Sequence, residues 1–599
     1  MFGVSMKWFL AIVVGLLGSS VSQAAWDTPE NANPILPGYF ADPSIFYDST
    51  SKAYYVFATT DGNWISYSSE PTVWSTTDFV HWKSQPLTLP ATWPTSPLWA
   101  PSIVKHPSNG RYYLLYADNG GTFIAMADSP LGPWTNATSG TSASTAPLYA
   151  SGSMWGSNDG IDAQFFADGN TIYMTFGGSG KVGIARLAFA ANGLASIDNS
   201  DTRMTDGTTH KYKSLAGATN FLEGSCMFRS GTTYFLTYSN SACQNYNVQY
   251  AHATSPVGPF TYASGQIVAR DNANGILGPG HNSILQVGNS WYIVYHRQHY
   301  QYVDVKRQIC MNQITINGTS ISSGVQTQAG IGSGTGALET LFTSARAASE
   351  KDLAFGKTVL ASSESDYKGG TGSGEKFAAV THFYAARYAV DHNNGTLWAP
   401  SSLPGNLVVD LGSDQSVGRC ETTFEYVLRT YKYKIEYLSA SEAANITAAQ
   451  SSSAWHSYAD RSKNSQKLSP VVDAMGVVAR YLRLTVLSAD IPTASAEITT
   501  IVQTDYADRV GVVEFKVFGP TTALHGVDAY RVPGQATLRT TGNIVVFPER
   551  FRGTSKCITV FDYSGKLLHT RTTRSDWIDL RNDLGLSAGD YVVTVEAAP

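Results

Sequence analysis

The sequence predicts an all-β protein in which a five-bladed β-propeller is followed by two β-sandwich regions. The prediction rests on a repeat of about sixty residues in the first half and on alternating strands in the second. Each repeat has a short apolar strand, a turn rich in Gly, Asn or Ser, and a strand rich in Tyr. Aligned on the first strand, the repeats begin at Asp42, Ala100, Asp162, Glu223 and His281, with spacings of 58, 62, 61 and 58 residues.

The repeats also share their endings, which are "WSTTDFVHW" (74–82), "MADSPLGPW" (126–134) and "HATSPVGPF" (252–260). Each ending finishes a strand with a turn and a Trp or Phe. A unit of two hairpins at this period is typical of a four-stranded propeller blade. A parallel β-helix needs much shorter repeats, and a β-sandwich has no such period. We therefore expect the propeller to span residues 30–320.

Residues 1–24 have the pattern of a secretory signal peptide. Lys7 supplies the positive start, Trp8–Gly18 the short apolar core, and Ser22-Gln23-Ala24 a small-residue cleavage site. The segment is too short for a membrane anchor, and no later segment approaches a spanning length. We expect a secreted protein that is extracellular or at the cell surface, with the periplasm as a further option.

Charge and composition exclude some classes of partner. The 599 residues include 41 basic and 46 acidic side chains, a net charge of −5, with no basic stripe that would follow nucleic acid. Aromatic residues are plentiful, with 33 Tyr, 25 Phe and 13 Trp. They suit stacking on sugar faces, but they suit an all-β core equally well.

The five cysteines are too few and too scattered for a disulfide framework. We expect mostly buried free thiols, although Cys226 and Cys243 lie close enough in sequence to pair. No CxxC motif or His/Cys cluster indicates zinc. The remaining cysteines are Cys310, Cys420 and Cys557.

The leading residues of the repeats are the candidates for chemistry. The innermost strand of each blade lines the central channel, so these positions converge on one mouth of it. Asp42, Asp162 and Glu223 would bring three carboxylates together there, and like charges at such a place repel. Taken alone, Asp42 before Pro43 is explained by a turn. Three acids at equivalent positions instead indicate a functional site.

Two carboxylates across a cleft can cleave a glycosidic bond, because one protonates the leaving oxygen while the other activates water or attacks the sugar. A third acid can raise the pKa of the proton donor. The same side chains, together with a His, also suit calcium or a transition metal, so a metal at this mouth remains open.

The propeller resembles glycoside hydrolase family 43 over about Asn33 to Gly318. The resemblance is carried by five motifs in order and at blade spacing: "NPILPGYFADPSI" (33–45), "LWAPSI" (98–103), "IDAQFFADG" (161–169), "LEGSCMF" (222–228) and "GPGHNSI" followed by "WYIVYHRQ" (278–298). It implies an inverting hydrolase of arabinose- or xylose-containing polysaccharides. The two carboxyl groups of such an enzyme stand ~6.5–9.5 Å apart.

Carried over position by position, the resemblance makes Asp42 the general base, Glu223 the general acid, and Asp162 the group that tunes and orients Glu223. Trp99 would stack on the sugar, with a blade-core Trp as the alternative. His281 would lie below the sugar and help to hold water or an ion, with a buried core His as the alternative. Substrate contact is also implied for Arg307 in "VKRQIC", and the family's frequent Asp-Pro is replaced here by Asp162-Ala163.

After the propeller, residues 321–350 are rich in Gly, Ser and Thr and predict a closing strand and a linker. Residues 351–519 resemble the discoidin, or factor V/VIII type C, β-sandwich. The motifs are "DLAFGKTVLASSES" (352–365), "VDHNNGTLWAPSSLPGNLVVDLG" (390–412), "YKYKIEYLSAS" (431–441), "ARYLRLTV" (479–486) and "VGVVEFKVFG" (510–519). The domain is either a carbohydrate-binding module or a buttress of the propeller.

Residues 520–599 resemble the small terminal β-sandwich modules of exported bacterial enzymes, which implies sorting or surface attachment. For the whole chain we expect an α-L-arabinofuranosidase acting on plant arabinan or arabinoxylan. The alternatives are a β-xylosidase, an endo-arabinanase, and a glycan-binding propeller without activity. No cofactor is expected to be required, a structural calcium is an option, and the partner is a polysaccharide rather than nucleic acid or a membrane.

Overall fold

The computed structural model describes most of the chain from Ala25 onward. The described residues are 25–61, 71–90, 93, 99–118, 120–138, 147–157, 159–205, 211–241, 243–298, 307–365, 384–427, 429–465, 467, 469–490, 510–520, and short pieces between 535 and 597. The predicted signal peptide (1–24) lies outside them. In this part of the chain no helix is long and apolar enough to cross a membrane.

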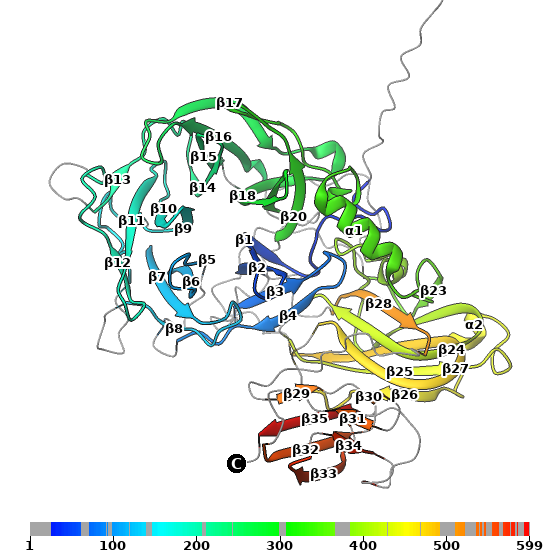
Figure 1. Ribbon diagram of the computed structural model, residues 1–599. Coiled ribbons are helices and arrows are strands. Elements are labelled where there is room, and N and C mark those ends of the chain that lie inside the picture. Colours follow the sequence, from blue (N-terminus) through cyan, green and yellow to red (C-terminus); the bar gives the residue numbers. More distant parts are fainter. Residues whose placement is uncertain are drawn as a thin grey trace, which may run out of the picture.

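The first domain consists of antiparallel sheets that follow one another around a ring (Figure 1). The first sheet is β1 (Phe40–Asp48), β2 (Ala53–Thr60), β3 (Thr72–Thr76) and β4 (Lys83–Pro86), and the second is β5 (Trp99–Lys105), β6 (Tyr112–Asp118), β7 (Gly121–Ala127) and β8 (Thr135–Asn136). The third is β9 (Gln164–Asp168), β10 (Thr171–Phe176), β11 (Gly183–Phe189), β12 (Ala195–Ile197) and β13 (Lys213–Ser214). The fourth is β14 (Glu223–Ser230), β15 (Thr233–Asn240), β16 (Asn247–Ala253) and β17 (Thr261–Val268), and the fifth is β18 (Leu277–Val287), β19 (Ser290–Gln298) and β20 (Arg307–Ile314).

The innermost strands of neighbouring sheets contact each other in sequence order, and β18 contacts β1 to close the ring. Serine hydroxyls tie one inner strand to the next by accepting backbone hydrogen bonds. These bonds join Ile103 to Ser44 at 3.3 Å, Phe165 to Ser102 at 3.0 Å, and Ile45 to Ser283 at 3.2 Å. The predicted all-β propeller is confirmed. Its blade number stays a prediction, since the five sheets are those of the described residues only.

The ring closes where the two ends of the domain meet. Ile35 N–H donates to Ile309 O of β20 at 2.8 Å, and the Asn33 side chain bonds the backbone of Met311 on the same strand. The beginning and the end of the propeller are thus held together by hydrogen bonds to β20.

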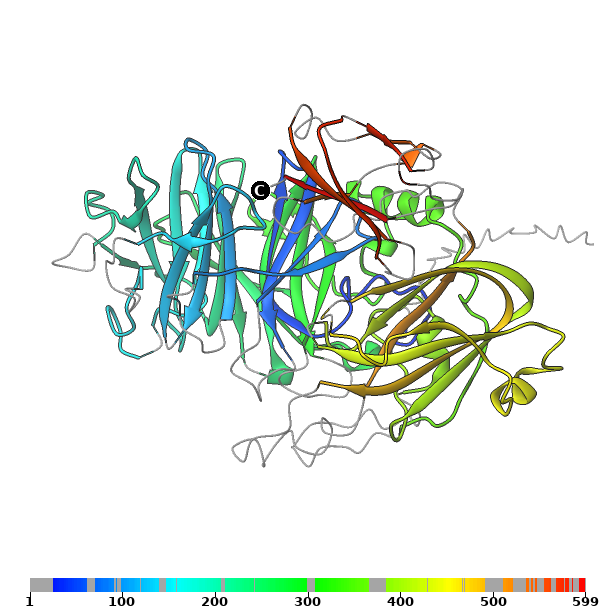
Figure 2. The same ribbon diagram turned by 90° about the horizontal axis from the view of Figure 1, so that it is seen from below.

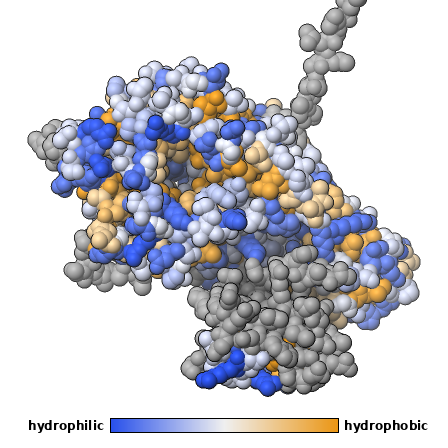
Figure 3. Space-filling model, viewed as in Figure 1, coloured by the Kyte–Doolittle hydropathy of each residue, from blue (hydrophilic) through white to orange (hydrophobic). Residues whose placement is uncertain are grey.

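On the face shown in Figure 3, the surface is hollowed at the centre of the ring.

The stretch predicted as a closing strand and linker also contains a helix that the sequence reasoning missed. After β21 (Ile316–Asn317) and β22 (Ser320–Ile321), helix α1 spans Ala337–Ala348. Its Leu338 and Phe342 lie one turn apart and pack into the core of the first sheet. Because "ALETLFTSARAA" consists largely of good helix formers, propensity and burial agree here.

The second domain is a β-sandwich beside the first and last sheets of the propeller (Figures 1 and 2). Its strands are β23 (Thr358–Ala361), β24 (Gly405–Phe424), β25 (Tyr431–Leu438), β26 (His456–Asp460), β27 (Val471–Ala489) and β28 (Val512–Phe518), with a short helix α2 at Ile446–Gln450. The sheet order is β23-β24-β27-β25-β26, with β28 paired to β24. Its core gathers around the fully buried Trp398, Phe424, Tyr433 and Phe515.

The sandwich is bonded to the start of the propeller. The Tyr39 hydroxyl donates to Glu425 at 2.8 Å, Glu30 N–H donates to Asp391 O at 2.9 Å, and the Asn393 amide donates to Trp26 O at 2.9 Å. Buried polar bonds of this kind fix one geometry between two units, because a lost partner leaves a buried group unsatisfied.

The C-terminal module contains two small sheets. They consist of β29 (Gln535–Thr537), β32 (Lys556–Phe561), β33 (Leu567–Thr573) and β35 (Val592–Ala597), and of β30 (Thr540–Thr541), β31 (Ile544–Val546) and β34 (Trp577–Asp579). Their described core includes Ile558, Val560, Ile578, Val593 and Val595.

The cysteines are mostly buried free thiols, as expected. Cys226, Cys310 and Cys420 are buried, and Cys557 is partly exposed. Cys226 is free, so the alternative of a Cys226–Cys243 disulfide is wrong. Cys226 lies inside β14, where its side chain takes part in the blade core.

Candidate active site

Each inner strand has, within it or just before it, a residue with a left-handed backbone. The angle φ is +51° at Asp42, +47° at Ala100, +55° at Asp162, +64° at Gly224 and +39° at His281. In four of the five sheets the pairing with the second strand shifts register at this residue, which marks a β-bulge. Only Gly takes this conformation without strain, and such strain clusters at functional sites.

These angles correct the predicted alignment of the fourth repeat by one residue. The left-handed residue there is Gly224, so Glu223 is equivalent to Trp99, which precedes Ala100. Glu223 therefore enters the site from the position before the bulge, not from the position of Asp42 and Asp162. The sequence alignment placed Glu223 with the other acidic residues. The residue that takes the left-handed conformation in this repeat is instead the glycine that follows it, because glycine does so without strain.

Asp42 is buried, with 4% of its surface exposed, and is surrounded by donors. The Thr59 hydroxyl donates to Oδ2 at 2.8 Å, and Arg307 Nη1 lies 3.0 Å from Oδ1. His281 Nδ1 and His296 Nδ1 lie 3.3 Å and 3.1 Å from the same oxygen. Burial alone would raise the pKa of Asp42, but Arg307, His281 and His296 together hold it well below its usual value.

Arg307 is itself held by a second buried carboxylate. Asp61 is 2% exposed and accepts from Arg307 Nε at 2.9 Å and from Nη2 at 3.0 Å, while its Oδ2 also accepts from the Arg307 backbone N–H at 3.0 Å. This two-point contact fixes the plane of the guanidinium. The remaining nitrogen, Nη1, is thereby directed to Asp42.

Glu223 opens β14 and is partly exposed, as a group that meets a substrate must be. The Tyr246 hydroxyl donates a short hydrogen bond to Oε1. Burial, and then the charge of Asp42, raise the pKa of Glu223 to about 7, although Arg307 opposes this. The Glu223 carboxyl group is therefore protonated below about pH 7.

Asp162 lies beside both of the other acids. Its Oδ2 accepts from Gly224 N–H at 3.2 Å and lies 3.5 Å from His281 Nδ1. Burial, and then the charges of Glu223 and Asp42, raise the pKa of Asp162 well above its usual value. Asp162 thus bonds the residue next to Glu223 and fixes the backbone from which the Glu223 side chain projects.

Two buried histidines lie beneath the acids. His281 is 2% exposed and lies between Asp42 and Asp162, with its Nε2 3.3 Å from Gln164 Nε2. Burial lowers its pKa, and burial followed by the charge of Arg307 lowers the pKa of His296 to about 4. Both rings are therefore neutral at neutral pH. His296 Nδ1 also accepts from Asp42 N–H at 3.2 Å, which joins β1 to β19 at the base of the site.

The structure thus brings Asp42, Asp162, Glu223, His281 and Arg307 close together, while their roles stay a prediction. Trp99, at the start of β5, is half-buried and occupies the position equivalent to Glu223. Four further residues were missed: Thr59, Asp61, Tyr246 and His296. His296 stood inside the quoted "WYIVYHRQ" motif, but nothing in the sequence linked the other three to the acids.

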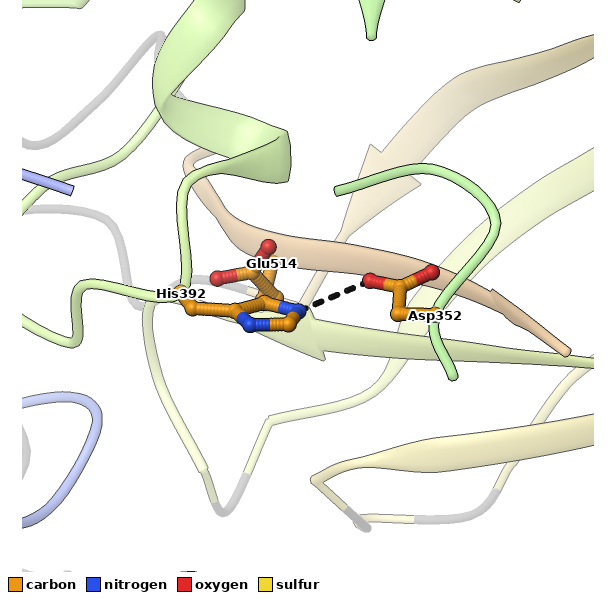
Figure 4. A group of neighbouring side chains, drawn as sticks. All are labelled: Asp352, His392 and Glu514. Carbon is orange, nitrogen blue, oxygen red and sulfur yellow. Dashed lines mark hydrogen bonds and ion pairs between the residues drawn. The ribbon is translucent and has the colours of Figure 1, made fainter. Parts of the chain in front are cut away.

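A metal at the channel mouth near His281, which the sequence left open, is not tested here. The group of metal-ligand side chains that the described residues contain lies in the sandwich instead, and consists of Asp352, His392 and Glu514 (Figure 4).

An ionised carboxylate and a carboxyl group that keeps its proton are the base and the acid that a glycoside hydrolase uses. Residues 31–320 form a domain of glycosyl hydrolases family 43, whose members act with inversion. Residues 388–484 match the NedA-like, galactose-binding domain, in agreement with the predicted discoidin-like sandwich.

Curated relatives are similar to somewhat less than half of the chain. A beta-D-galactofuranosidase of Aspergillus niger is 27% identical over 289 residues, which cover 45% of this chain and 76% of that protein. An arabinoxylan arabinofuranohydrolase of Bacillus subtilis is 25% identical over 49% of this chain and 63% of its own length. A probable arabinan endo-1,5-alpha-L-arabinosidase A of Aspergillus clavatus is 26% identical over 44% of this chain and 82% of its own length.

Among solved structures, a protein described as a glycoside hydrolase superposes with a TM-score of 0.61 at 23% identity. The match covers 81% of this chain and 98% of that one. This likeness supports the fold across both the propeller and the sandwich.

Proposed function

We propose that this enzyme is an α-L-arabinofuranosidase that removes arabinose from plant cell-wall polysaccharides such as arabinan or arabinoxylan. The observation that carries the proposal is the opposite shift of two carboxyl pKa values in one site, low at Asp42 and about 7 at Glu223. The sugar is suggested by the relatives, which include an arabinoxylan arabinofuranohydrolase and a probable arabinanase.

In the proposed mechanism Asp42 is the general base. Its carboxylate stays ionised beside Arg307, so it can take a proton from the water that attacks the anomeric carbon. Inversion requires room for this water, and we expect ~6.5–9.5 Å between the carboxyl groups of Asp42 and Glu223. The Thr59 hydroxyl and Arg307 donate to the Asp42 carboxylate and hold it in place, while the neutral rings of His281 and His296 lie beside it.

Glu223 is the proposed general acid, because its carboxyl group keeps a proton up to about pH 7 and is partly exposed. Asp162, the proposed tuning group, orients it through the bond to Gly224. Trp99 would stack on the sugar from the neighbouring blade. Arg307 would contact the substrate through N–H groups that do not bond Asp42 or Asp61.

The test is a panel of nitrophenyl glycosides and polysaccharides with analysis of the products. We expect release of arabinose from the α-L-arabinofuranoside, arabinan or arabinoxylan, with the product first formed in the inverted anomeric configuration by NMR. Preference for the β-D-xyloside, release of oligosaccharides, or preference for a β-D-galactofuranoside would replace the proposed substrate. Asp42→Asn should abolish turnover while circular dichroism and melting stay unchanged. Binding of oligosaccharides with no hydrolysis of any of them would support the non-catalytic alternative.

For the other parts of the chain we propose the roles that the sequence indicates. The signal peptide would export the enzyme, the sandwich would bind glycan or brace the propeller, and the terminal module would serve attachment. The bonds from Tyr39 to Glu425 and from Asn393 to Trp26 support bracing. No cofactor would be required for hydrolysis, so activity should survive dialysis against a chelator.

A further inference from the structure

A repeated hydrogen bond joins neighbouring sheets at the mouth of the propeller. In four sheets one residue of the second strand pairs with the residue just before the left-handed position of the first strand. In the first, second, fourth and fifth sheets this second-strand residue is Thr59, Ala117, Ser239 and His296, respectively. These four residues are therefore equivalent.

Three of the four accept the backbone N–H group of the left-handed residue in the following sheet. The bonds run from Ala100 N–H to Thr59 Oγ1 at 2.8 Å, from His281 N–H to Ser239 Oγ at 2.7 Å, and from Asp42 N–H to His296 Nδ1 at 3.2 Å. A bulge disturbs the ladder of its own sheet, and a buried N–H group needs an acceptor. A side chain of the preceding sheet supplies it.

The second sheet has no such side chain, because the equivalent residue is Ala117. The donor that it fails to serve is the N–H group of Asp162, the left-handed residue of the third sheet (φ +55°). Asp162 is 8% exposed, and no acceptor in the described part of the chain bonds its N–H group. An unpaired N–H group at a buried residue is rare and costs stability.

The third sheet also lacks the side-chain acceptor, but there the donor has a different partner. Gly177 occupies the equivalent place, since its N–H group donates to Ile161 O at 3.0 Å. The donor of the fourth sheet, Gly224 N–H, bonds the Asp162 carboxylate instead. Within the described residues, the Asp162 N–H group is thus the member of this set that is left without an acceptor.

The unpaired N–H group lies at the place where the sugar is expected. Its own residue carries the carboxyl group that holds Gly224 next to Glu223. Ala117 pairs with Trp99, which is the proposed stacking residue. An oxygen atom from a bound molecule could therefore take the position that the Thr59 hydroxyl takes in the first sheet.

We propose that the Asp162 N–H group binds a hydroxyl oxygen of the substrate sugar in the place left empty by Ala117. This assignment rests on the proposed function, since it requires the sugar to lie between Asp42 and Glu223. A hydroxyl group suits the place because it accepts from an N–H group and donates to a carboxylate at the same time, as Thr59 does with Ala100 and Asp42. A sugar without this hydroxyl would leave the N–H group unpaired, so the site would discriminate against it.

Ala117→Ser is the sharpest test, because it gives the second sheet the hydroxyl that Ser239 gives the fourth. The new hydroxyl should accept from Asp162 N–H and displace the sugar hydroxyl. We expect a melting temperature equal to that of the parent or a few degrees higher. KM should rise about 3- to 10-fold, which is the worth of one neutral hydrogen bond, while kcat changes little. The substrate is the nitrophenyl glycoside that the parent hydrolyses fastest.

A series of the same glycoside with single hydroxyl groups replaced by hydrogen identifies the bound group. For one member of the series the parent should lose more of its kcat/KM than Ala117→Ser does, because the variant has already given up that bond.

Ala125→Ser is the matched control. Ala125 is fully buried on β7 of the same sheet, within an apolar cluster. A hydroxyl there should lower the melting temperature and leave KM unchanged.

The proposal is overturned if Ala117→Ser is as stable as the parent and keeps its KM, since a water molecule then satisfies the Asp162 N–H group. It is also overturned if no deoxy glycoside distinguishes the two proteins, or if Ala117→Ser loses as much stability as Ala125→Ser. Should Ala117→Ser fail to fold, hydrogen exchange of the Asp162 amide in the parent decides, because the released sugar must slow it and unchanged exchange rejects the bond.

Failure of the proposed function gives a different result. A preference for another glycoside changes only the substrate of these measurements. An active Asp42→Asn variant would remove the catalytic site itself, whereas an unchanged KM in Ala117→Ser with an inactive Asp42→Asn rejects the N–H assignment alone.

Discussion

Asp61 holds the Arg307 guanidinium with both of its carboxylate oxygens, at 2.9 Å and 3.0 Å, and so leaves one guanidinium nitrogen for Asp42. The bonds from Asp61 hold the Arg307 guanidinium in a fixed position next to the proposed base. A buried carboxylate stays ionised only with such compensation. The first prediction follows from this arrangement.

Replacing Arg307 with Gln should shift the acid limb of the pH profile. Arg307 lowers the pKa of Asp42, so its loss raises that pKa, and the base then stays protonated to a higher pH. We expect kcat/KM to fall by at least about tenfold at pH 5, corresponding to about 1.4 kcal/mol, with a smaller loss near pH 7. An acid limb that stays in place would contradict the role of Arg307.

The alkaline limb should report Glu223. Its pKa is raised to about 7, so the group is protonated below that pH, and activity falls as the pH rises through it. In Glu223→Gln the limb should disappear together with most of the activity on polysaccharide. A dinitrophenyl arabinoside, whose leaving group needs little protonation, should retain much of its rate. Equal losses on both substrates would argue against a general acid.

Removing the hydroxyl of Tyr246 should move the alkaline limb upward. A hydrogen bond donated to a carboxylate favours the ionised form, so Tyr246→Phe raises the pKa of Glu223 further. We expect a several-fold loss of kcat with little change in KM, because the position of the acid is less well fixed. Tyr262→Phe, which removes a hydroxyl from the outer strand β17, should leave the profile unchanged.

Gly224→Ala should damage both stability and activity. Gly224 has φ +64°, and an added Cβ would lie 3.0 Å from His281 Cγ. Gly231 has φ +60° with open space around it, so Gly231→Ala tests the backbone strain alone, about 1 kcal/mol. We expect Gly231→Ala to remain active and Gly224→Ala to lose more stability and most of its turnover. Equal effects of the two substitutions on melting and rate would show that the contact with His281 is unimportant.

The sequence predicted the fold class and the main acids because both depend on a periodic pattern. Asp42, Asp162 and His281 mark the same backbone position in three repeats, and the positive φ values bear this out. The pattern failed at Glu223, which lies one residue before that position. The alignment was guided by the charge of Glu223, but the residue with the positive φ in this repeat is Gly224.

The residues that support the acids could not be found in this way. Asp61 lies at the end of a hairpin strand and meets Arg307 across a sequence separation of 246 residues. Tyr246 reaches Glu223 from a loop between two strands. Such contacts are created by ring closure and by loop conformation, and neither leaves a local period in the sequence. Helix α1 was missed for a different reason, since the Gly-rich stretch before it resembles a linker.

The hydrogen bond from Asp42 N–H to His296 crosses the seam where the first blade of the ring meets the last. The proposed base therefore depends on the contact between the first and last sheets as well as on its own hairpin. Any loosening of that contact, by heat, by denaturant or by a change in the N-terminal segment, would separate Asp42 from its histidine before the individual sheets come apart. Hydrolysis should then decline before the β-structure is lost, so activity would report the state of the contact between the first and last sheets.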